Sequence, residues 1–121
     1  MSKSAKHRPE RLAALIQETI AHALATDVKD PRVGFVTITA VTVSPDAGHA
    51  TVRVSDMGTD EVKARAMEGL ESARGFLRTF LARALTLRTT PELHFTLDRS
   101  LEHAARIDHL HAQIKREENR P

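Results

Sequence analysis

Apolar residues along this 121-residue chain first follow the spacing of a helix. Between residues 10 and 26 they recur every three or four positions, as Leu12, Ile16 and Ile20 do, which predicts an amphipathic helix with Pro9 at its first position. Pro31 ends this pattern, because the residue before a proline disfavours helical geometry. Residues 1–8 are polar and basic, so we expect a flexible basic arm there.

The pattern then changes to the alternation of β-strands. Residues 36–43 are rich in valine and threonine, and residues 50–54 alternate apolar and polar side chains, so residues 35–55 are predicted to form a β-hairpin. The alternation shifts by one residue near Ala40, which indicates a bulge. Pro45 and Gly48 supply the turn, since Pro45 presets φ and Gly48 can take a positive φ.

A second helical pattern begins after Thr59, which is a suitable N-cap. Its apolar stripe runs from Val62 to Leu85 and keeps its phase across Gly75. An interior glycine weakens a helix, so a kink is expected at Gly75, separating two joined helices that cover the same sheet.

Residues 93–97 alternate again and predict a third strand, and residues 101–117 predict a weakly amphipathic terminal helix. The fold class is therefore α+β: a three-stranded sheet with helices on one face. Residues 9–116 form a single domain, and residues 117–121 form a frayed tail.

Composition excludes several kinds of site. The chain has no cysteine, which excludes disulfides and thiol chemistry and fits a cytoplasmic protein. No apolar run is long enough to cross a membrane, and no nucleotide-binding or hydrolase motif is present. His103, His109 and His111 lie near Asp108, but their spacing does not make them converge, so no metal or cofactor is expected.

Positive charge is concentrated in one segment. The whole chain has a net charge of +2, whereas residues 63–88 have a net charge of +4. Arg74 and Arg78 share one flank of the apolar stripe, and Arg74 adjoins Gly75. A glycine lets a phosphodiester approach, amides opening the next helix would donate to it, and arginine binds phosphate. A solvated charged face is the competing interpretation.

Several stretches together resemble the ribosome-binding factor A family. They are residues 29–32, 36–39, 43–46, 50–55, 70–78 and 87–95, followed by Asp98 and Ser100. The resemblance covers about residues 8–115 and implies a KH-like type II domain with the order α-β-β-α-α-β. KH modules clamp RNA with a GxxG loop, which is absent here; family members carry Ala-x-Gly, matched by Ala73, Arg74 and Gly75. Arg53 departs from the family pattern, since many relatives carry an aromatic residue there.

The resemblance implies a cytoplasmic, monomeric, non-enzymatic factor that binds the free small (30S) ribosomal subunit through rRNA and assists late maturation and processing of 16S rRNA. Assembly GTPases are further candidate partners. The RNA-binding candidates from the residues and the resemblance are Ala73, Arg74, Gly75, Arg78, Lys63, Arg83, Arg88, Arg8 and Arg11. Two alternatives stay open: a protein-interaction module that docks on ribosomal proteins or an assembly GTPase, and a small hydrolase that uses histidine and aspartate. Ser44, Asp46 and His49 are close in sequence, but we interpret them as turn residues.

Overall fold

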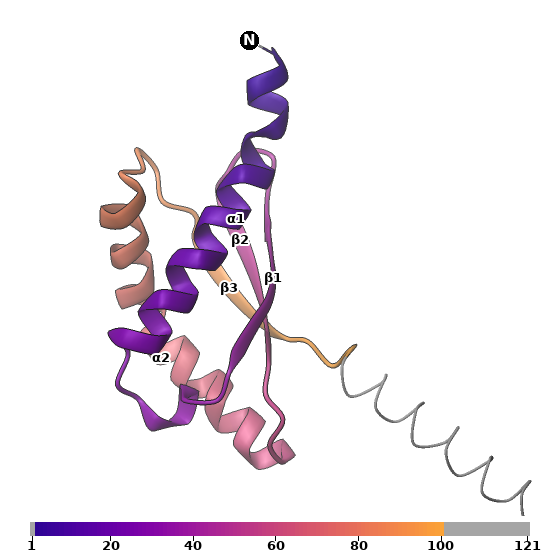
Figure 1. The fold of residues 1–121 in the computed structure, drawn as a ribbon, viewed down its shortest axis with the longest axis vertical. Coiled ribbons are helices and arrows are strands. Elements are labelled where there is room, and N and C mark those ends of the chain that lie inside the picture. Colours follow the sequence, from indigo (N-terminus) through magenta and orange to yellow (C-terminus); the bar gives the residue numbers. More distant parts are fainter. Residues whose placement is uncertain (1, 101–121) are drawn as a thin grey trace, which may run out of the picture.

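The computed structural model describes the backbone of residues 2–100 and the side chains of residues 9–100. The elements in chain order are α1 (Ser2–Thr26), the short 3₁₀ helix η1 (Pro31–Val33), β1 (Thr37–Val43), β2 (His49–Ser55), α2 (Asp60–Leu85) and β3 (Glu92–Leu97). The terminal helix expected at 101–117 and the tail at 117–121 lie outside the described residues. The α+β class is confirmed (Figure 1).

The sheet has the order β1-β2-β3, with β2 in the middle. β1 and β2 form the expected antiparallel hairpin, whereas β3 runs parallel to β2. A parallel neighbour needs a long crossover connection, and α2 provides it. The predicted bulge is confirmed, because the register shifts between Ile38 and Ala40.

One hydrophobic core joins one face of the sheet to both helices. Ala50, Val52 and Val54 of β2 are buried against residues of α1 and α2, including Ile16 and Leu70. The opposite face of the sheet carries exposed side chains such as His49 and Arg53. This arrangement leaves the outer sheet face and the outer sides of the helices accessible.

The kink prediction is only partly correct. Figure 1 shows the two halves of α2 running in different directions, but α2 is one continuous helix from Asp60 to Leu85 and is not divided at Gly75. A single glycine costs a helix only about 1 kcal/mol. Burial of Leu70, Leu77 and Leu81 on either side of it outweighs that cost. The N-cap prediction is confirmed, since the Thr59 hydroxyl accepts from the Val62 amide at 3.2 Å.

Two further details differ from the expectations. α1 begins at Ser2, so the backbone of residues 2–8 is helical and Pro9 lies inside the helix rather than at its start. The N-terminal end of α1 projects beyond the sheet (Figure 1). In the hairpin turn, Ala47 rather than Gly48 has the positive φ, at 58°. The turn is closed by the Ala47 amide, which donates to the Ser44 carbonyl at 2.8 Å. The left-handed residue is therefore Ala47, one position before Gly48.

Among residues 2–100, neither long helix is apolar over enough of its length to cross a membrane.

Candidate nucleic-acid interface

Gly75 lies on the exposed side of α2, in a position where the fold does not require a glycine. Its φ is not positive, and a Cβ atom added there would meet nothing within 4 Å. Gly69 on the same helix is different, because a Cβ there would stand 2.8 Å from Cγ1 of Val33. Gly69 is therefore explained by close packing, whereas Gly75 weakens the helix without any packing benefit.

The continuity of α2 corrects one part of the expected chemistry. Amides inside a helix donate to carbonyls one turn earlier, so no second helix N-terminus opens after Gly75. The Thr79 hydroxyl also donates to the Gly75 carbonyl, at 3.1 Å. A phosphate at this position would therefore depend on neighbouring side chains and on the space left by the missing side chain.

Arg74 and Arg78 supply the charge next to this space. Both are exposed, and Ala73 beside them is half-buried. An Nη1 nitrogen of Arg74 lies 3.5 Å from a carboxylate oxygen of Glu71, and both side chains are about half exposed. Arg78 donates from Nη2 to the Thr90 carbonyl at 3.0 Å. This hydrogen bond holds the guanidinium near the chain that leads into β3 without neutralising its charge.

Lys63 differs from the other candidates, because it is only 8% exposed. It precedes Ala66 by three positions and Leu70 by seven, so it lies on the buried stripe of α2. Helical periodicity could have placed it there. A residue with so little exposed surface offers a nucleic acid little to contact, which sets Lys63 apart from the exposed arginines.

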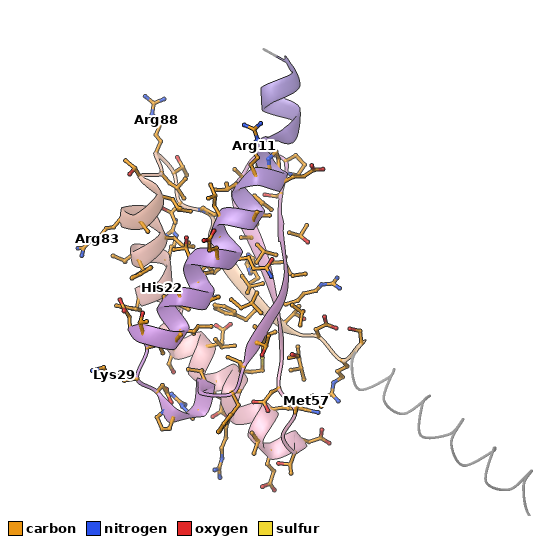
Figure 2. All side chains as sticks on the ribbon, in the orientation of Figure 1. Arg11, His22, Lys29, Met57, Arg83 and Arg88 are labelled. Atoms are coloured by element: carbon orange, nitrogen blue, oxygen red, sulfur yellow. The ribbon has the colours of Figure 1, made fainter. Side chains whose placement is uncertain are left out.

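Arg83 and Arg88 are exposed at the far end of α2 and in the loop that follows it. Figure 2 shows both side chains pointing away from the core. Arg11 is exposed on α1, and the Arg8 side chain lies outside the described side chains.

The structure brings Arg11 and Arg88 to one groove. This groove, about 680 Å³ in volume, lies between α1, the hairpin turn and the loop after α2, and Leu12, Leu15 and Leu87 form part of its apolar lining. Asp46 also lines it. Arg11 and Arg88 are far apart in the chain, and no local pattern could join residues of α1 to the loop before β3. The groove combines apolar surface with two arginines and one aspartate.

The hairpin confirms the interpretation of Ser44 and Asp46 as turn residues, whereas His49 is the first residue of β2. The Ser44 hydroxyl donates to Asp46 at 2.7 Å and accepts from the His49 amide at 3.0 Å. The Gly48 amide donates to the same Asp46 carboxylate. The hydrogen bond from the Ser44 hydroxyl, followed by that from the Gly48 amide, lowers the pKa of Asp46. The ring of His49 contacts His94 instead.

The cluster of His103, Asp108, His109 and His111 lies outside the described residues.

Comparisons with known proteins identify relatives over nearly the whole chain. The model of a family described as ribosome-binding factor A matches residues 8–111. A ribosome-binding factor A from Thermomicrobium roseum is 46% identical over 114 residues, which are 94% of this chain and 88% of that protein.

Solved structures are similar as well. The crystal structure of ribosome-binding factor A from Thermus thermophilus matches with a TM-score of 0.67 and 28% identity, over 76% of this chain and 97% of that one. A homology model of the Thermus thermophilus factor, fitted into a cryo-electron microscopy map of its complex with the 30S subunit, matches with a TM-score of 0.59 and 30% identity, over 72% and 91% of the two chains. The fold is thus KH-like, as the resemblance implied.

Proposed function

Because the chain belongs to the ribosome-binding factor A family, we propose that it binds the free small (30S) ribosomal subunit through rRNA and assists late maturation and processing of 16S rRNA. It acts in the cytoplasm as a monomeric binding factor and does not catalyse a reaction.

The environment of Gly75 carries the proposal for the interface. A glycine at an exposed, regular helical position with open space around it has no structural benefit. The missing side chain lets an RNA backbone approach the helix closely at this point. Arg74 and Arg78, one residue before and three after, provide the planar donors that phosphate oxygens accept.

Three further arginine candidates extend this surface along the molecule. Arg83 and Arg88 continue from α2 into the following loop, and Arg11 faces the same groove as Arg88. Few aromatic side chains are available for base stacking, since the chain contains four phenylalanines and no tryptophan or tyrosine. Contacts of this kind recognise the shape and phosphates of the rRNA rather than its sequence.

Cosedimentation with purified ribosomal particles tests the proposal. We expect the wild-type protein to pellet with free 30S subunits and not with assembled ribosomes. The double variant Arg74→Glu/Arg78→Glu should bind 30S subunits at least about tenfold more weakly, because it loses two phosphate contacts and gains repulsion. The control Lys29→Glu/Arg53→Glu makes the same change in net charge at exposed positions away from Gly75 and should bind much more tightly than the double variant. A folded Arg74→Glu/Arg78→Glu variant with normal binding would contradict the assignment.

A protein-interaction module is the second candidate function, and the exposure of Phe76 favours it. Phe76 is 47% exposed directly beside Gly75, with its ring packed against Phe80 at a centroid distance of 6.1 Å. Docking on a ribosomal protein or an assembly GTPase through this ring would make binding insensitive to salt and sensitive to Phe76→Ser. Binding that weakens with salt and is unaffected by Phe76→Ser supports rRNA contact.

A further inference from the structure

The parallel pairing of β2 and β3 places three metal-ligating side chains together on the outer face of the sheet. His49 begins β2 and lies directly opposite Glu92, which begins β3. His94 is two residues further along β3, so its side chain is on the same face as that of Glu92. All three side chains are exposed, so an ion can reach them from solvent.

The donor atoms of these side chains converge. Nδ1 of His49 lies 3.0 Å from Nε2 of His94, and the two rings are stacked with their centroids 5.2 Å apart. The same Nδ1 lies 3.7 Å from a carboxylate oxygen of Glu92. One ligand atom from each residue lies within 4.8 Å of the other two.

We propose that His49, Glu92 and His94, together called the strand-start cluster, form a binding site for a divalent transition-metal ion of the Zn²⁺ type. Two imidazole nitrogens and one carboxylate oxygen are a donor set that Zn²⁺ accepts, with water in the fourth position. Two nitrogens at about 2.0–2.1 Å from a tetrahedral ion stand about 3.3 Å apart. The 3.0 Å separation of the ring nitrogens is thus close to the bound geometry.

The backbone around the cluster is fixed before any ion binds. The Glu92 amide donates to the Gly48 carbonyl at 2.9 Å, and the His49 amide donates to the Ser44 hydroxyl at 3.0 Å. These bonds hold the first residues of both strands in register. An ion bound by side chains of both strands would join the beginnings of β2 and β3, and it would stabilise the folded chain because the unfolded chain does not hold the three groups together.

The same geometry also has an explanation without a metal ion, and the test must distinguish the two explanations. One neutral histidine ring can donate its N–H to the lone pair of the other, which also brings two ring nitrogens to 3.0 Å. That arrangement needs no cation and gives no reason for Zn²⁺ to stabilise the protein through these residues.

The proposal is tested by adding Zn²⁺ to the full-length protein. Isothermal titration calorimetry measures the Kd for Zn²⁺, and thermal unfolding measures the change in Tm. The variants are His49→Gln and His94→Gln, and the control is His22→Gln, which removes an exposed histidine of α1 (Figure 2). We expect the wild type and the control to bind Zn²⁺ with the same Kd and to gain the same increase in Tm. Each cluster variant should bind at least about tenfold more weakly and lose that gain. Mg²⁺ prefers oxygen ligands, so it should leave the Tm of the wild type and of every variant unchanged.

Two outcomes would overturn the proposal. One is a wild-type protein whose Tm does not respond to Zn²⁺. The other is a pair of cluster variants that bind Zn²⁺ as tightly as the wild type, which would place the ion on other histidines. Ring-nitrogen NMR signals of His49 and His94 that shift on Zn²⁺ addition, while that of His22 does not, provide a second readout that does not depend on stability.

Discussion

At the scale of single residues, Gly75 separates the demands of folding from those of binding. The change Gly75→Ala places a Cβ in open space on a regular helix, so we expect the free energy of unfolding to rise by about 0.5–1 kcal/mol. Affinity for 30S subunits should fall, because the methyl group occupies the space next to Arg74. Urea denaturation and cosedimentation measure the two effects. A more stable variant with unchanged affinity would show that Gly75 does not serve the interface.

Asp98 is the second residue with a measurable consequence. The hydrogen bond from the Thr39 hydroxyl, at 2.7 Å, and those from Ser100 lower the pKa of this carboxyl from 3.8 to about 2. A carboxyl with a lowered pKa stabilises the folded state above its unfolded pKa, and this contribution is lost as the pH falls through its folded pKa.

We therefore expect Asp98→Asn to be less stable than the wild type at neutral pH, with a difference that shrinks between about pH 4 and pH 2. Urea denaturation at a series of pH values measures this. Thr39→Val should show the same trend, because it removes the hydrogen bond with the largest effect on the pKa. A difference that stays constant down to pH 2 would contradict the assignment.

At the scale of elements, Gly69 controls how closely α2 approaches η1. A Cβ at this position would stand 2.8 Å from Cγ1 of Val33 and 3.2 Å from Cβ of Arg32. Arg32 cannot easily move away, since its guanidinium is hydrogen-bonded to Asp30 at 2.6–3.0 Å. We expect Gly69→Ala to lower the free energy of unfolding by about 1–3 kcal/mol. Gly75→Ala is the matched control on the same helix, and equal effects of the two changes would refute this account.

At the scale of the whole molecule, the proposed binding to rRNA depends on where the positive charges lie, because the net charge is only +2. Arg11 and Arg88 come from distant parts of the chain but line one groove. If both contact rRNA phosphates, Arg11→Ala and Arg88→Ala should each reduce the slope of log affinity for 30S subunits against log salt by about 0.7–0.9. Titrations at several salt concentrations measure the slope. Unchanged slopes in both variants would exclude the groove from the interface.

Local features of the fold were predictable because their causes lie within a few residues. The one-residue shift of alternation near Ala40 produced the observed bulge, and Thr59 caps α2 as expected. The division of α2 into two helices at Gly75 was predicted from an intrinsic preference of about 1 kcal/mol, which the packing of α2 against the sheet outweighs, so the helix stays continuous. Lys63 became a candidate through its charge alone, whereas its position on the buried stripe of α2 leaves it only 8% exposed.

The amino-acid sequence by itself determined the order of the three strands and of the long helical segments, the arginines beside Gly75 and the family, because these depend on periodicity, turn chemistry and ordered motifs. Only the tertiary structure decided which distant residues meet. The parallel pairing of β2 with β3 brings His49 to Glu92 and His94, and the packing of α1 beside the loop after α2 brings Arg11 to Arg88. Such contacts follow from the register of the whole sheet and from the burial of one common core. Neither cause can be found in a short stretch of sequence.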